Sequence, residues 1–228
     1  MEERKPEAFL LENVKNLKTH DKGRTFRIIK ETLEKLGYYI KIEVLNSMTH
    51  GNVPQNRERI FLVGFLDKGK ADNFRFPNEI PLKISFRDLA AKEADNKYYY
   101  NDKPLYVKIK NDVNSEQTVY QWRRRYVRAN KKGVCPTLTA NMGRGGHNVP
   151  IIKNTIGIRK LTPRECFLIQ GFPQSFKLPE SLPDCHLYHQ AGNSVTVPVI
   201  GRIAENMKKV LLNEVPLRKD VLTTYFKN

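Results

Sequence analysis

Three charged residues have the types and spacing to stabilise charge on a bound substrate. Glu12 follows a short apolar run at residues 9–11, and Arg57 and Arg59 lie just before a second apolar run at residues 60–65. A carboxylate and a guanidinium held in place can stabilise charge of either sign that develops on a substrate. Taken singly, the plainer interpretations are favoured: Glu12 as a strand-end carboxylate in solvent, and the arginines as a charged loop.

The order of motifs along the chain favours chemistry over these plainer interpretations. The motifs are Phe-Leu-Leu-Glu-Asn-Val (9–14), Gln-Asn-Arg-Glu-Arg (55–59), Arg-Lys-Leu-Thr-Pro-Arg-Glu (159–165), Gln-Gly-Phe-Pro (170–173) and Gln-Ala-Gly-Asn-Ser-Val-Thr-Val-Pro-Val (190–199). This series resembles the C-terminal motifs of DNA (cytosine-5) methyltransferases, and a series is far more specific than one motif. Those enzymes begin with a glycine-containing cofactor loop and a Pro-Cys-Gln loop, and the 228 residues contain neither. The resemblance is therefore to the second subunit of a split, two-chain enzyme.

The resemblance implies covalent catalysis on cytosine. A thiolate adds at C6 of the base, so that C5 can attack the sulfonium methyl group of S-adenosylmethionine. By resemblance, Glu12 contacts ring N3 and the exocyclic amine, and Arg59 reaches O2. Arg57 belongs to the same catalytic motif, where it and Gln55 act as supports. The complementary N-terminal subunit is expected to bring the cofactor loop and the cysteine of Pro-Cys-Gln.

The last motif implies contact with S-adenosylmethionine in a pocket shared with the partner chain. Asn193 and Ser194 are expected to touch the amino-acid end of the cofactor, with Val195 beside them. The same residues also suit a plain Gly-Asn turn in which Ser194 caps the final helix. Both roles can coexist, because a helix N-terminus also suits a carboxylate.

Residues 85–158 resemble the target-recognition domain of these enzymes. They contain a Thr-Leu dipeptide, a glycine-rich loop that permits close backbone approach to a groove, and a basic stretch suited to phosphates. Donors in the loop could read base edges. The residues expected to contact DNA are Arg123, Arg124, Arg125, Thr137, Leu138, Asn141, Gly143, Arg144, Gly145 and His147. An ordinary glycine hairpin loop and a solvated basic face are the alternatives, and Trp122 is expected in the core.

The three cysteines, Cys135, Cys166 and Cys185, show no paired spacing, which favours reduced thiols over disulfides. None of them matches the nucleophile of the family, because Cys135 precedes a proline instead of following one. Cys185 and two nearby histidines do not make the four well-spaced ligands of a structural zinc site. No metal is expected.

The coarse pattern predicts an α/β fold. Residues 9–14 read as a buried strand, followed by a helix that Asp21 caps and Gly37 ends. Apolar and charged residues alternate over residues 40–44, as in a strand with one face in solvent. The continuously apolar residues 60–65 indicate a central strand. In the fold that the resemblance implies, this last strand is inserted between its two predecessors.

Later segments add a small β-rich insert and two helices. Alternation predicts short strands at residues 106–110 and 124–128. Thr162, Pro163 and Glu165 form a capping-box pattern at the start of a helix that Gly171 ends. The final helix is expected to begin near Ser194.

These elements predict a partial Rossmann-like methyltransferase sheet with its closing helix, plus a small β-rich target-recognition domain. The expected boundaries are residues 1–84 for the C-terminal part of the catalytic domain, 85–158 for target recognition, and 159–228 for a bracing helix and the closing helix.

Charge favours a nucleic-acid partner. The 228 residues carry 40 basic and 24 acidic side chains, a net charge of +16 and a pI near 9.8. Such a surface suits phosphate neutralisation, with an acidic membrane surface as a weaker alternative. No apolar stretch approaches a spanning helix, and the opening residues lack a signal-peptide pattern. A cytoplasmic bacterial protein, associated with the nucleoid through DNA binding, is expected.

The sequence therefore predicts a subunit of a site-specific DNA cytosine-5 methyltransferase of bacterial restriction and modification, which flips its target base out of duplex DNA. The chain alone is expected to be inactive. The alternatives are a catalytically inactive DNA-binding module, a truncated remnant of such an enzyme, and a basic RNA-binding protein, which only the charge favours.

Overall fold

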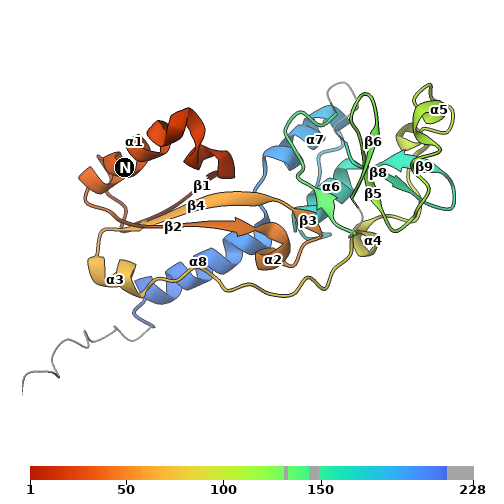
Figure 1. Ribbon diagram of the computed structural model, residues 1–228. Coiled ribbons are helices and arrows are strands. Elements are labelled where there is room, and N and C mark those ends of the chain that lie inside the picture. The colour runs from red at the N-terminus through yellow and green to blue at the C-terminus, as the bar shows by residue number, and fades with distance from the viewer. Residues whose placement is uncertain (131–132, 144–148, 215–228) are drawn as a thin grey trace, which may run out of the picture. The chain divides into compact units, whose positions relative to one another are not determined.

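The first element, β1 (Ala8–Val14), pairs antiparallel with β4 (Glu58–Phe65), which lies between β1 and β2 (Tyr39–Asn46) in a three-stranded sheet. The computed structural model describes residues 1–130, 133–143 and 149–214 (Figure 1). In β4, Ile60, Val63 and Phe65 are 0% exposed, whereas most of β2 is half-buried or exposed. The prediction that the last strand is inserted between its predecessors and lies deepest is confirmed.

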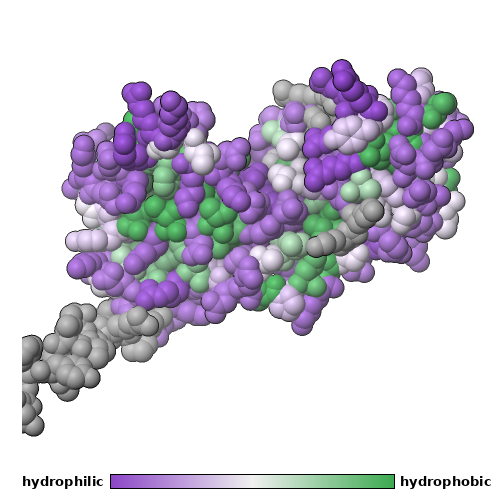
Figure 2. Space-filling model, in the orientation of Figure 1, coloured by the Kyte–Doolittle hydropathy of each residue, from purple (hydrophilic) through white to green (hydrophobic). Residues whose placement is uncertain are grey.

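Helix α1 (Arg24–Lys35) covers one face of this sheet. Its apolar residues recur at helical spacing, and Leu33 packs with Phe9, Tyr38, Ile60 and Leu62 in one core cluster. α3 (Lys68–Asn73) and α8 (Val197–Leu211) lie on the other face (Figure 1). Figure 2 shows hydrophobic surface over this sheet, between α1 and α8.

A glycine inside β4 makes room for an aromatic ring. Gly64 lies directly opposite Phe9, and a Cβ at Gly64 would meet the Phe9 ring at 2.2 Å. The ring in turn packs edge-on against Tyr38, at 4.9 Å between centroids. Gly64 therefore fits a close approach that a side chain would prevent.

The predicted cap of α1 is wrong. Asp21 has φ 50° inside η2 (His20–Gly23), and the helix begins at Arg24 after Gly23, whose φ is 83°. Asp21 lies two residues too early to cap this helix. The predicted end is correct, because Gly37 has φ 93° just after the last turn.

A second sheet has the strand order β6-β5-β8-β9. In a separate pair of parallel strands, β3 and β7, Gln55 lies opposite Cys135. The strands are β3 (Gln55–Asn56), β5 (Val119–Trp122), β6 (Val127–Asn130), β7 (Cys135–Pro136), β8 (Ile151–Lys153) and β9 (Ile158–Lys160). The short helices are η1 (Lys15–Lys18), α2 (Ser47–Gly51), α4 (Phe86–Leu89), η3 (Asn96–Tyr98) and α5 (Tyr106–Ile109).

Two predicted strands of the insert need correction. Residues 106–109 form helix α5, in which Ile109 is buried and Val107 is 70% exposed. Four or five residues are too few to separate a strand from a helical turn by alternation. At residues 124–128 only the end is extended, because Arg124 and Arg125 form the turn that precedes β6. Trp122 packs against a buried cluster with Tyr120, as expected.

The capping box of α6 (Pro163–Ile169) is confirmed. The hydroxyl of Thr162 accepts from the amide of Glu165, whose carboxylate accepts from the amide of Thr162. Ser194, however, does not cap the final helix. It is the C-cap of α7 (Asp184–Asn193), and α8 begins three residues later at Val197.

The chain divides into two compact units. One comprises Met1–Leu45, Glu58–Asn78 and Gly201–Asn228, and the other comprises Asn46–Arg57 and Glu79–Ile200. The core of the second unit combines residues of β5, β7, α6 and α7 with Leu138 from the segment after β7; the others are Val119, Cys135, Cys166, Phe167, Leu187 and Tyr188. The α6 and α7 segment and the β-rich segment therefore share one core.

Candidate functional site

Glu12 and Arg59 form an ion pair on one face of the β1–β4 ladder. Glu12 lies opposite Phe61 and Arg59 opposite Val14, so the two charged side chains are diagonal neighbours on the same face. Arg59 Nε lies 2.9 Å from Glu12 Oε1, and the two side chains are 15% and 24% exposed. Burial lowers the pKa of Arg59, and the nearby Glu12 carboxylate opposes that change. The strands thus hold a carboxylate and a guanidinium together, partly shielded from water.

Arg57 has a different environment. It is 3% exposed, and its guanidinium donates to three backbone carbonyls: Leu138 at 2.7 Å, Gly192 at 3.2 Å and Ser194 at 2.8 Å. These carbonyls belong to segments 81 to 137 residues further along the chain. Arg57 therefore clamps the Thr-Leu segment to the end of α7, which favours a supporting position over contact with a substrate.

Gln55 and Gln170 extend this clamp. Gln55 Nε2 donates to Gln170 Oε1 at 3.0 Å, and its Oε1 accepts from the Leu138 amide at 3.0 Å. Gln170 Nε2 donates to the Ala191 carbonyl at 2.7 Å, and the Gln170 carbonyl accepts from the Val197 amide at 2.9 Å. Both glutamines are 0% exposed. These contacts place both glutamines inside the protein, where they hold the segments around them together.

Two buried hydroxyls, that of Ser47 outside the motifs and that of Thr196 inside the last one, complete the network. Ser47 Oγ lies 2.7 Å from Thr196 Oγ1, which donates to Gln170 Oε1 at 3.3 Å. Ser47 also donates to the carbonyl of Arg57. The burial of Ser47 is visible only in the structure, because Ser47 lies outside the motifs and outside the predicted elements.

The three residues expected at the cofactor lie at the junction of α7 and α8. Asn193 is exposed, and its amide nitrogen lies 3.1 Å from His189 Nε2. Ser194 is half-buried and donates from Oγ to the Ala191 carbonyl at 2.8 Å, which leaves its lone pairs able to accept. Val195 is half-buried. The junction therefore offers an amide and a hydroxyl on a segment that Arg57 fixes.

Three of the residues expected to contact DNA line one cavity of about 580 Å³: Arg123, Thr137 and Asn141. Thr137 Oγ1 donates to the Asn56 carbonyl at 2.7 Å, and Thr139 Oγ1 donates to Asn141 Oδ1 at 2.5 Å. The other lining residues are Met48, Asn56, Gln121, Arg128, Asn130, Val134, Cys135, Pro136 and Thr139. Leu138 is 0% exposed and faces the core, so its contribution is to packing.

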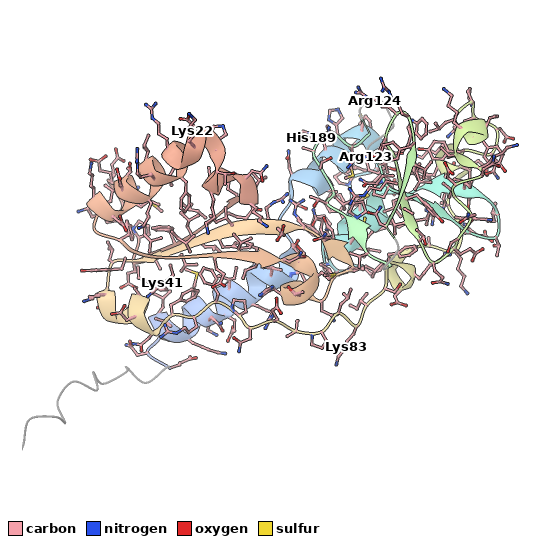
Figure 3. All side chains as sticks on the ribbon, viewed as in Figure 1. Lys22, Lys41, Lys83, Arg123, Arg124 and His189 are labelled. Carbon is pink, nitrogen blue, oxygen red and sulfur yellow. The ribbon has the colours of Figure 1, made fainter. Side chains whose placement is uncertain are left out.

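The basic stretch lies at the tip of the β5–β6 hairpin. The Arg123 amide donates to the Tyr126 carbonyl at 2.9 Å, which closes a turn at Arg124 and Arg125. Arg124 has φ 65°, an unusual conformation outside glycine, and both turn residues are exposed. Figure 3 shows Arg123 and Arg124 on this hairpin.

Gly143 is required where it lies. Its φ is +77°, and an added Cβ would meet Tyr188 Cδ2 at 2.8 Å and Cys185 Cα at 3.2 Å. The remaining residues expected in this loop, Arg144, Gly145 and His147, lie outside the described residues.

The environments of the cysteines disfavour a nucleophilic role. Cys135 and Cys166 are both 0% exposed, and burial raises the pKa of each thiol well above its ordinary value. A thiolate is the nucleophile, so these two sites oppose the reactive form. Cys185 is half-buried on α7. Across the described residues, all three cysteines are free and no cluster of three or more metal-ligating side chains occurs. No described helix is long and apolar enough to cross a membrane.

Comparison with known proteins identifies the family. The model of the C-5 cytosine-specific DNA methylase family matches residues 1–209. The type II methyltransferase M.Bsp6I of Bacillus sp. (strain RFL6) is 56% identical over 213 residues, which cover 92% of this chain and 67% of that protein. M.NlaX of Neisseria lactamica is 42% identical, with 91% of this chain and 64% of that protein covered. The chain thus spans about two thirds of the length of these relatives.

Solved structures agree in fold. The Entamoeba histolytica methyltransferase EhMeth superposes with a TM-score of 0.66 at 20% identity, over 90% of this chain and 63% of that one. The Dnmt2 methyltransferase of S. pombe gives 0.66 at 19% identity, over 91% and 66%. The predicted fold, a partial Rossmann-like methyltransferase sheet, is confirmed. On the family match and these identities, the chain belongs to the C-5 cytosine-specific DNA methylase family.

Proposed function

We propose that this chain supplies target recognition and part of the cytosine pocket to a site-specific DNA cytosine-5 methyltransferase of bacterial restriction and modification. The observation that carries the proposal is the Glu12–Arg59 pair, which presents opposite charges 2.9 Å apart in a partly shielded position. Methylation at C5 builds charge on the cytosine ring, and a preorganised acidic and basic pair can meet that charge at two edges. S-adenosylmethionine, when bound, supplies the methyl group.

Each charged residue has one role in this proposal. Glu12 accepts from the exocyclic amine and holds a proton at N3 of the flipped base, while Arg59 donates to O2. Arg57 positions the Thr-Leu segment and the α7–α8 junction through its three carbonyl contacts. At that junction, Asn193, Ser194 and Val195 face the amino-acid end of the cofactor, for which an exposed amide and a hydroxyl are suitable donors and acceptors.

The nucleophilic cysteine lies, in this proposal, on a second polypeptide that carries the cofactor loop and Pro-Cys-Gln. Two observations support it: the 228 residues contain no Pro-Cys-Gln, and the thiols of Cys135 and Cys166 are buried with raised pKa. The division into catalytic residues 1–84, target-recognition residues 85–158 and bracing and closing residues 159–228 belongs to the same proposal. So do flipping of the target base, a cytoplasmic location, and nucleoid association through DNA.

A DNA-binding module without catalysis is the second candidate. The cavity beside Arg123, Thr137 and Asn141 favours it, because binding there needs no cysteine. The two candidates differ over Glu12 and Arg59, which only the enzyme requires for its chemistry.

Variants of the charged pair test the proposal in the assembled enzyme. Glu12→Gln and Arg59→Ala are each expected to lower the rate of methyl transfer about a hundredfold or more, because each removes a contact made to the charged ring. Glu31→Gln makes the matched change in an exposed ion pair on α1 and is expected to leave the rate unchanged. Near-normal turnover in Glu12→Gln or Arg59→Ala would contradict the role assigned to that residue. Co-purification of each variant with the second chain controls for loss of assembly.

A further inference from the structure

The β5–β6 hairpin has two chemically distinct faces. Side chains alternate along a strand, and the register pairs Gln121 with Arg128 and Val119 with Asn130. Tyr120 and Trp122 pack on the opposite side, in the cluster that contains Ile109 and Ile151. The polar face is therefore turned away from this cluster, and it contributes Gln121, Arg123, Arg128 and Asn130 to the cavity of about 580 Å³.

The wall across the cavity is also polar and is fixed by hydrogen bonds. Asn46 donates to Asn56 Oδ1 at 2.7 Å, and Thr137 donates to the Asn56 carbonyl. Arg57 and Gln55 hold the adjoining Leu138 backbone from the other side. The cavity thus combines the guanidinium groups of Arg123 and Arg128 with several amides and hydroxyls, and no carboxylate is among the lining residues that the structure describes. Such a lining suits an anionic ligand with many hydrogen-bonding groups.

Gln121 has an acceptor without a partner. Within the described residues, its Oε1 has less than 1 Å² of exposed surface and no hydrogen bond. Asn130 on the neighbouring strand differs, because its amide donates to the Val119 carbonyl at 3.0 Å. Leaving a buried acceptor unsatisfied costs free energy, so packing alone does not account for a glutamine at this position. A ligand that donates a hydrogen bond inside the cavity would provide one.

We propose that Gln121 reads a base edge of duplex DNA. When the side chain turns so that the buried, unpartnered Oε1 enters the cavity, this oxygen accepts from an exocyclic amine in the major groove, which adenine presents at N6 and cytosine at N4. Arg123 and Arg128, on the same face, hold the flanking phosphates or a neighbouring guanine. The inference rests on the proposed function, because it takes the ligand of this unit to be the DNA that the enzyme modifies.

The test uses the full 228-residue chain and a pool of DNA duplexes with a randomised centre. Bound duplexes are sequenced, and the preference at each base pair is compared between the wild type and Gln121→Ala. The variant is expected to lose preference at one base pair by about tenfold or more, and to keep it at the others. Gln117→Ala is the matched control, because Gln117 is exposed and lies outside the cavity lining. Gln121→Met, which keeps the length of the side chain, repeats the test should the alanine variant fail to fold.

The outcomes separate this inference from the proposed function. If the wild type selects a sequence and both Gln121 variants select it equally well, Gln121 is not a reader, although the recognition role stands. If the variants bind all duplexes more weakly by the same factor, Gln121 contacts phosphate or supports the fold, and the inference is again overturned. If the wild type selects no sequence, both the inference and the recognition role are contradicted. Loss at one base pair alone, with an unchanged melting temperature, supports the inference.

Discussion

Arginine serves at least three distinct purposes in this chain, and burial separates them. Arg57 is 3% exposed and donates to three carbonyls, so its charge is used inside the protein. Arg59 is partly exposed and paired with Glu12, so its charge is preorganised but reachable. Arg124 and Arg125 are exposed at a hairpin tip. Positions two residues apart in one motif therefore have different environments, which the motif alone does not predict.

Tyr100 should make the stability of the protein depend on alkaline pH. It is 7% exposed, and burial raises its pKa to about 12. A raised pKa means that the folded state holds the phenol proton more tightly, so this contribution is present below pH 10 and is lost between about pH 10 and 12. Replacement by phenylalanine should flatten the fall in the free energy of unfolding over that window, by up to roughly 3 kcal/mol.

Chemical denaturation at several pH values measures this effect. Tyr126→Phe is the control, because Tyr126 is 60% exposed, and it is expected to behave as the wild type. Equal slopes for Tyr100→Phe and the wild type would show that burial of Tyr100 does not perturb its titration.

At the residue scale, motif order predicted which side chains to examine but not what each contacts. Glu12 and Arg59 could be singled out because they belong to recognisable motifs, and strand register then brings them together. The partners of Arg57 could not be predicted, because all three are backbone carbonyls far along the chain. Gln121 lies in no motif. Strand alternation in residues 119–122 was the available signal for its face, and the unpartnered oxygen is visible only in the structure.

At the scale of elements, α7 approaches the Thr-Leu segment so closely that a glycine is needed between them. A Cβ on Gly192 would lie 2.2 Å from the backbone carbon and oxygen of Thr139, and backbone cannot move aside as a flexible side chain can. Gly192 also supplies one of the carbonyls that Arg57 binds. This contact joins the last motif to the wall of the cavity.

Alanine substitutions at two helical glycines should have opposite effects. Gly192→Ala is expected to lower the free energy of unfolding by roughly 1 to 3 kcal/mol or more, because it overpacks this contact, and to weaken DNA binding as residues 137–141 shift. Gly201→Ala in α8 has nothing within 4 Å of the added Cβ and is expected to raise the free energy of unfolding by roughly 0.5 to 1 kcal/mol. Urea denaturation of both variants checks the signs. A neutral Gly192→Ala would mean that α7 does not pack tightly against Thr139.

Elements with strong patterns were predicted well, and short ones were not. The continuous apolar run of β4 and the capping box of α6 are long or specific signals, and both are confirmed. α5 has only four residues, and its alternation fitted a strand as well as a helical turn. Ser194 was misplaced because α7 runs through the expected Gly-Asn turn to Asn193.

At the scale of the whole molecule, the net charge of +16 predicts that binding of the chain to DNA depends strongly on salt. If Arg124 and Arg125 contact phosphates, replacing either with alanine should weaken binding to all duplexes alike. It should also flatten the plot of log affinity against log salt concentration by about one unit per lost contact. Arg27→Ala removes an exposed arginine on α1 and should leave the slope unchanged if α1 lies off the DNA. If neither Arg124→Ala nor Arg125→Ala changes this slope, the phosphate contacts lie elsewhere.

In the proposed enzyme, the groups needed for methyl transfer are divided between this chain and a second one. The Glu12–Arg59 pair and the α7–α8 junction lie on these 228 residues, which are proposed to recognise the target, and the nucleophile and the cofactor loop are proposed to lie on the complement. The most direct test is transfer of a labelled methyl group from S-adenosylmethionine to DNA, measured with the purified chain alone and with a second polypeptide that carries Pro-Cys-Gln and the cofactor loop. We expect no transfer by the chain alone and transfer by the mixture. Sustained transfer by the chain alone would contradict the proposal that the nucleophile and the cofactor loop lie on a second polypeptide.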